Sequence, residues 1–202
     1  MTKSVRAQER TEETGQVRLI SLMPETKLPP AIRDACDADF SDLLGECGDF
    51  FLLADSASSR DQALSGEHPL LILRRDMVAP PLSLLESTAL AMEEFDAVVG
   101  PAFDGSLYAL GVNEPDSLGE EMSVLVRRAT TEIVSLRDAT KTLSASGLTW
   151  YCLAPWYCAA DAASRRFAGD HLQALCASGD DEFVAERCLR VFRAGAEGTL
   201  NQ

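Results

Sequence analysis

Two aspartates follow apolar runs and are placed where they could act together. Asp76 ends the segment HPLLILRRD, and Asp104 lies in the loop GPAFDG, which follows the apolar run AVV. In α/β proteins with a largely parallel sheet, ligands bind at the carboxyl ends of the strands. We therefore expect both carboxylates at one edge, where such a pair suits a hard divalent cation, Mg or Mn. The cation would neutralise a diphosphate that an acidic protein otherwise repels.

Each aspartate also has a purely structural interpretation. An aspartate before a glycine is common in turns, because its side chain hydrogen-bonds the local backbone. This reading is the stronger one for Asp104 taken alone. An aspartate after a strand is often the N-cap of the next helix, and for Asp76 the two readings stay open.

The elements around these residues alternate between strand and helix. Apolar runs bounded by prolines and polar residues predict strands over 17–24, 68–76, 96–101 and 148–157. Helical spacing predicts a helix over 80–95 and a long helical region over 120–147, closed by a C-cap at Gly147. The residues after the last strand should be mostly helical. This pattern predicts one α/β domain over residues 16–202 with a mostly parallel sheet, after a flexible polar tail of residues 1–15.

Composition limits the class of ligand. The chain has 202 residues, 46% of them hydrophobic and 25% charged, which is typical of one soluble globular domain. Its net charge of −14 argues against a nucleic-acid partner, which would require a basic footprint. The apolar runs are far shorter than the roughly 20 residues of a membrane span, and the N-terminus lacks the apolar core of a signal peptide. We expect a cytoplasmic protein with no membrane partner; the oligomeric state, a homodimer included, stays open.

The cysteines and histidines indicate no second site. The six cysteines form no Cys-x-x-Cys pair and have no histidine at zinc-ligand spacing. Free and mostly buried thiols are expected, with a disulfide between Cys152 and Cys158 left open. His68 and His171 lie far apart, and neither adjoins a recognisable nucleophile motif.

One segment carries a family resemblance. GPAFDGSLYALGV, residues 100–112, resembles the pattern Gly-Pro-Ala-x-Asp-Gly-Gly-Tyr-x-Leu-x-Gly of a bacterial glycosyltransferase-like family of unknown function, of the type associated with radical-SAM or selenodomain proteins. Members have the nucleotide-diphospho-sugar transferase (GT-A) fold. Upstream, the segment 71–102 fits the family without a gap and places Asp76 on the family's acid. Weaker matches at 41–46, 130–148 and 153–157 extend the resemblance over residues 17–172.

The sequence departs from the family at its first loop and before the first acid. The family's Lys-x-Pro-x-x-Gly-x-x-Lys-Thr-Arg loop is missing, and VRLISLMP resembles the family's second strand, so we expect an N-terminally shortened version of the fold. The family's Gly-Ser before the acid is Arg74-Arg75 here. These guanidinium groups either grip a diphosphate or fill the cleft that a nucleotide needs.

Two further departures concern the loops. The family's late Asp-Val-Asp turn is Cys158-Ala159-Ala160 here, with Asp161 one place further on. The second glycine of the family's Gly-Gly pair is Ser106, whereas Tyr108 is retained.

The resemblance implies a three-layer α/β/α fold and a chemistry. In active members it implies a divalent cation that binds the diphosphate of a nucleotide sugar or of another nucleotide-linked small molecule. The cation would assist departure of the nucleotide while an acceptor attacks the sugar. On that basis Asp76 would be a metal ligand, and Asp104 a metal ligand or the acceptor-side base. The substrate would be lined by Arg74, Arg75, Gly105, Ser106 and Tyr108. For Tyr108, packing under the loop is an equally favoured interpretation.

Two hypotheses about function follow. The first is a transferase, either a glycosyltransferase or, by fold analogy alone, a nucleotidyltransferase; the acids Asp76 and Asp104 favour it. The second is a catalytically degenerate member that serves as a binding or regulatory protein. The missing first loop and the Cys-Ala-Ala turn favour this second hypothesis.

Overall fold

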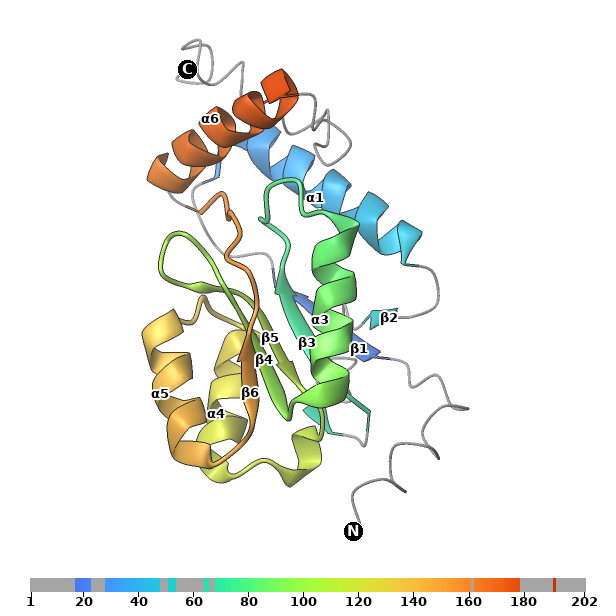
Figure 1. Ribbon diagram of the computed structural model, residues 1–202, viewed down its shortest axis with the longest axis vertical. Helices are drawn as coiled ribbons and strands as arrows, with labels where there is room; N and C mark the ends of the chain where they lie inside the picture. Colours follow the sequence, from blue (N-terminus) through green and yellow to red (C-terminus); the bar gives the residue numbers. More distant parts are fainter. Residues whose placement is uncertain are drawn as a thin grey trace.

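The sheet is the centre of the molecule. The structure, a computed structural model, describes residues 17–22, 28–47, 51–53, 64–65, 68–160, 162–178 and 191. Within these residues one sheet has the strand order β2-β1-β3-β5-β4-β6 (Figure 1). Its strands are β1 (Val17–Leu22), β2 (Phe51–Leu53), β3 (Leu70–Arg74), β4 (Ala97–Pro101), β5 (Leu107–Val112) and β6 (Trp150–Cys152). Only β5 runs antiparallel to its neighbours, β3 and β4, so the described sheet is mostly parallel, as predicted.

Helices cover both faces of this sheet. They are α1 (Pro30–Glu46) and α3 (Leu82–Glu94) on one face and α4 (Glu120–Ala129) and α5 (Leu136–Ser146) on the other. Helix α6 (Ala162–Ser178) packs on α1, and a short 3-10 turn, η2, spans Pro115–Ser117. Leu71 and Leu73 of β3 pack with α1 and α3, whereas Leu70 and Ile72 pack with α4 and α5. The uninterrupted apolar run of β3 is explained by this alternation, because a strand covered on both faces needs apolar residues on both. The result is the predicted three-layer α/β/α fold.

The predicted long helical region over 120–147 consists of two helices separated by a short break. Helix α4 ends at Ala129, and α5 begins at Leu136 after the N-cap Ser135, whose Oγ accepts a hydrogen bond from the backbone N–H of Asp138 at 3.0 Å. The intervening residues 130–134 read Thr-Thr-Glu-Ile-Val, and such β-branched residues are poor helix formers. The predicted C-cap is confirmed, since Gly147 has φ 73° in the left-handed region.

Helix α1 was not predicted, because it follows a cluster of prolines that indicates a loop. Pro30 is its first residue, a position where the missing N–H and the fixed φ of proline are favourable. The second half of its buried face, with Phe40 and Leu43, packs on the sheet, and the first half packs on α6 through a third cluster that includes Cys36 and Leu172. The predicted tail of residues 1–15 and the helical prediction beyond residue 178 lie outside the described residues, apart from Val191.

Within the described residues, none of the helices combines the length and the apolar character that crossing a membrane requires.

Candidate functional site

Three segments that are distant in the sequence meet at the carboxyl edge of the sheet. They are the turn after β3, the loop between β4 and β5, and the segment after β6. The backbone N–H of Ala159 donates to the carbonyl of Asp76 at 2.8 Å, and that of Phe103 donates to the carbonyl of Trp156 at 3.1 Å. The prediction that Asp76 and the GPAFDG loop share one edge is therefore confirmed, and the Cys158-Ala159 turn joins them there.

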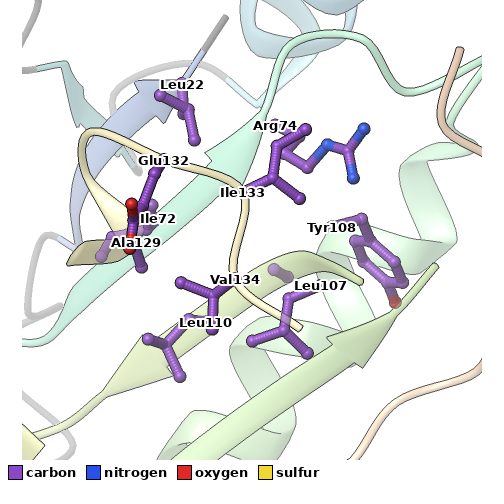
Figure 2. Close-up of a pocket in the computed structure, with 11 residues that line it drawn as sticks. Leu22, Ile72, Arg74, Leu107, Tyr108, Leu110, Ala129, Glu132, Ile133 and Val134 are labelled. Atoms are coloured by element: carbon purple, nitrogen blue, oxygen red, sulfur yellow. The ribbon is translucent and has the colours of Figure 1, made fainter. Parts of the chain in front are cut away.

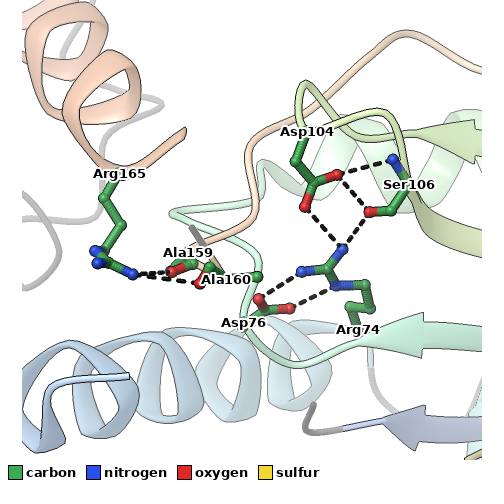
Figure 3. A network of polar contacts seen from close by, with 7 residues as sticks. All are labelled: Arg74, Asp76, Asp104, Ser106, Ala159, Ala160 and Arg165. Carbon is green, nitrogen blue, oxygen red and sulfur yellow. Dashed lines mark hydrogen bonds and ion pairs between the residues drawn. The ribbon is translucent and has the colours of Figure 1, made fainter. Parts of the chain in front are cut away.

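Arg74 lies between the two predicted acids and binds both (Figure 3). Its Nε donates to Oδ1 of Asp76 at 2.8 Å, and its Nη2 donates to Oδ2 at 2.7 Å. Its Nη1 donates to Oδ2 of Asp104 at 3.3 Å and also to Oγ of Ser106. The side chain of Arg74 is 3% exposed, that of Asp76 is 0% exposed, and that of Asp104 is 14% exposed. The centre of the site is thus a nearly buried guanidinium bridging two carboxylates.

The electrostatics keep this centre in a fixed state of charge. Burial alone would lower the pKa of Arg74, but its hydrogen bond to Asp76 and the negative groups around it outweigh burial and raise that pKa above its ordinary value. Burial raises the pKa of the Cys158 thiol well above its usual range, and the charge of Arg74 offsets this only in part. At neutral pH the site therefore holds a charged guanidinium beside an uncharged thiol.

The loop that carries Asp104 shows the turn chemistry that its sequence predicts, and its second carboxylate oxygen forms an ion pair. Oδ1 of Asp104 accepts hydrogen bonds from the backbone N–H of Ser106 at 2.9 Å and from its hydroxyl, which is turn chemistry. The other oxygen, Oδ2, faces Arg74. Gly105 has φ 82°, a conformation that favours glycine, so this residue allows the loop to turn. Asp76, in contrast, does not cap a helix, because α3 begins at Leu82 with Pro81 as its N-cap.

The break between α4 and α5 holds the same loop from its other side. The N–H of Leu107 donates to the carbonyl of Val134, and the N–H of Leu136 donates to the carbonyl of Gly105, both at 2.9 Å. Ser106 and Ser135 form an isolated antiparallel bridge. Sequence reasoning missed this contact; the β-branched run ending at a good N-cap was the signal that could have found it.

The remaining predicted substrate residues point elsewhere. Arg75 turns toward α1, where its Nη2 pairs with Oδ1 of Asp37 at 2.6 Å and its guanidinium lies 5.8 Å from the centre of the Phe40 ring. The structure therefore does not bring Arg75 together with Arg74. Tyr108 is 1% exposed, its hydroxyl donates to the carbonyl of Ala154 at 2.9 Å, and burial raises its pKa. This placement favours the packing interpretation of Tyr108.

A small cavity lies beside the network, between the sheet and the segment 129–134 (Figure 2). Its volume is about 20 Å³, and its walls are mainly apolar, with Ile72, Leu107 and Val134 among them. A volume of this size holds about one water molecule. The cavity is therefore too small for a nucleotide.

The residues at this edge do not fit a divalent cation as they stand. In the part of the chain that the structure describes, no group of three or more His, Cys, Asp or Glu side chains could hold a metal ion. Both predicted ligands, Asp76 and Asp104, already bind Arg74, and the adjacent Cys158 is a protonated thiol. Asp161, which follows the late turn, lies outside the described residues. A Mg or Mn site stays a prediction that metal titration has to test.

The described cysteines agree with the expectation of free thiols. Cys36 and Cys158 are buried, Cys47 is half-buried and Cys152 is exposed, and all four are free. The disulfide between Cys152 and Cys158 that the sequence left open is therefore not formed.

Comparison with known proteins supports the fold. No protein-family model matches the sequence, and no curated protein matches it significantly. Among solved structures, the chain is similar to a "putative nucleotide-diphospho-sugar transferase" from Desulfovibrio desulfuricans G20, with a TM-score of 0.60 and 12% identity over 93% of this chain and 97% of that one. The bifunctional IspDF from Campylobacter jejuni matches with a TM-score of 0.39 and 10% identity, over 69% of this chain and 49% of that one, a likeness too low to carry an argument. The chain has a nucleotide-diphospho-sugar transferase-like fold.

Proposed function

We propose that this protein uses a nucleotide-diphospho-sugar transferase-like scaffold for binding or regulation and not for metal-dependent transfer. The observation that carries the proposal is the closed network at the carboxyl edge, in which Arg74 binds both oxygens of Asp76 and one oxygen of Asp104. These are the two carboxylates that the family resemblance assigns to the metal of a transferase. Here they are occupied by a side chain of the same protein.

The energetics of the network support this proposal. A cation that bound Asp76 and Asp104 would have to displace a guanidinium that is 3% exposed. Breaking a buried, hydrogen-bonded ion pair by removing one partner costs about 3–5 kcal/mol. A metal–diphosphate complex would therefore have to pair with both carboxylates at least as well as Arg74 does before it gained any affinity.

The transferase is the second candidate, and a different observation favours it. Segments following β3, β4 and β6 converge on one edge, where this class of sheet binds its ligands. In this candidate Asp104 is the catalytic residue and, with Asp76, a ligand of Mg or Mn. Gly105 and Ser106 would contact the nucleotide-linked donor, and Arg74 would hold its diphosphate.

A thermal-shift screen separates the two candidates. Purified protein is melted with nucleotides and nucleotide sugars, each with and without Mn²⁺. A ligand at 100 times its dissociation constant adds about 2.7 kcal/mol, which raises the Tm of a domain of this size by about 5–10 °C. The proposal expects no Mn²⁺-dependent shift.

The screen is repeated on Asp104→Asn, with Asp138→Asn as the control at an exposed acid on α5. A Mn²⁺-dependent shift in the native protein that is lost in Asp104→Asn and kept in Asp138→Asn would contradict the proposal, favour the transferase candidate and justify assays for transfer.

A further inference from the structure

The Arg74 guanidinium occupies a place with the features of a cation site. Both oxygens of Asp76, one oxygen of Asp104 and the hydroxyl of Ser106 face this single group. Carboxylate and hydroxyl oxygens are also ligands for hard divalent cations. The same oxygens therefore suit either a planar guanidinium or a small metal ion, but not both at once.

The charges make a cation necessary at this place. Asp76 is 0% exposed, and burying a carboxylate without a positive partner is strongly unfavourable. Arg74 supplies one formal positive charge to two formal negative charges. Without its guanidinium both carboxylates would lose their positive partner, and Asp104 would keep only its hydrogen bonds from Ser106, whereas a divalent cation would match both charges.

We infer that Arg74 acts as a built-in cation that competes with divalent metal for Asp76 and Asp104, so that removing its guanidinium uncovers a metal site. This inference concerns the same network as the proposed function and rests on its central observation. Its test reads metal binding to the protein alone, whereas the proposed function is tested with nucleotides. The two can therefore fail separately.

The test is a titration of Mn²⁺, followed by electron paramagnetic resonance of the free ion, against three proteins. They are the native chain, Arg74→Met, and the double variant Arg74→Met/Asp104→Asn. Methionine keeps an unbranched apolar stem in place of the arginine and removes the charge. We expect no stoichiometric Mn²⁺ in the native chain and one ion per chain in Arg74→Met. Affinity should fall at least about tenfold in the double variant, since even outer-shell partners of a metal contribute that much.

The neighbouring arginine provides a matched control. Arg75→Met removes the same charge one residue away, from a side chain that is 27% exposed and paired with Asp37. It should gain no Mn²⁺ site. A site gained equally by Arg75→Met would mean that lower positive charge alone attracts the ion, and would overturn the inference.

Two further results would also overturn it. One is a folded Arg74→Met protein that binds no Mn²⁺; the other is a native chain that binds Mn²⁺ and loses it in Asp104→Asn. If Arg74→Met is unfolded in metal-free buffer, Mn²⁺ is added to that protein. Recovery of the fold with Mn²⁺, but not with KCl at equal ionic strength, supports the inference, and failure to recover contradicts it.

Discussion

Replacing Asp76 by asparagine removes one charge from a buried ion pair, in which the side chain of Asp76 is 0% exposed and that of Arg74 is 3% exposed. Arg74 then keeps its contacts with Asp104 and Ser106 but loses the charge that faces its Nε and Nη2. Because Arg74 keeps part of its pairing, the loss of unfolding free energy should lie near the lower end of the range for a broken buried ion pair, about 3 kcal/mol. For a domain of this size that corresponds to a fall in Tm of about 6–12 °C.

Asp104→Asn should lower the free energy of unfolding by less than Asp76→Asn does. The Asp104 contact with Arg74 is longer, at 3.3 Å, and an asparagine oxygen can still accept the hydrogen bond from the N–H of Ser106. A hydrogen bond to a charged group contributes about 1.5–3 kcal/mol, and the lower figure gives a fall of about 3–6 °C.

The assay is thermal and urea unfolding of these two variants beside Glu132→Gln. Glu132, in the segment between α4 and α5, pairs with Arg128 of α4, and because both side chains are about half exposed such a pair contributes little. We expect the largest fall in Tm for Asp76→Asn, a smaller fall for Asp104→Asn, and no measurable change for Glu132→Gln. A fall for Asp76→Asn no larger than that of the exposed control would refute the reasoning that burial makes this ion pair strong.

Two other predictions concern the surroundings of the site. In Gly100→Ala the new Cβ would lie 2.8 Å from Cε1 and 2.5 Å from Cε2 of Tyr108, with Cζ closer still, so urea unfolding should show a loss of at least about 1–3 kcal/mol. Gly45→Ala, inside α1 with nothing within 4 Å, should instead be neutral or stabilising. At high pH, Cys158 of the unfolded chain ionises near pH 9, whereas burial keeps the thiol of folded Cys158 protonated. The unfolded state then binds fewer protons than the folded state, so the free energy of unfolding falls as pH rises. Urea midpoints measured from pH 7 to 10.5 should decline above pH 9, less steeply in Cys158→Ala; an unchanged slope in that variant would contradict the assignment.

Much of the fold could be predicted from local sequence patterns. The run LLIL between polar neighbours predicts a strand buried on both faces, and β3 lies in the middle of the sheet for that reason. The spacing of the two acids from their strands was enough to predict that they share an edge. Helix α1 escaped prediction because Pro29 and Pro30 indicate a loop when nothing shows that a helix begins there.

The partner choice of Arg74 was beyond any local pattern. Arg74 and Arg75 are adjacent in the sequence, and nothing in the local pattern indicates which of them faces the cleft. The pleat sends the two side chains to opposite faces of the strand, and the segments packed on each face decide that one faces Asp104, thirty residues on, while the other faces Asp37 on α1. Such a long-range choice depends on tertiary packing, which single-sequence periodicity does not contain.

The reversed direction of β5 limits how this edge can recognise a ligand. The loop carrying Asp104 is a hairpin whose two ends are fixed in central strands, and its middle is bonded to Val134 and Leu136. A loop tethered in this way cannot swing like a lid. A molecule that binds here must match a preformed surface, which keeps the ordering entropy of binding small but narrows the range of shapes accepted. Selectivity at this edge would therefore come from rejection of poorly fitting molecules and not from adaptation to them.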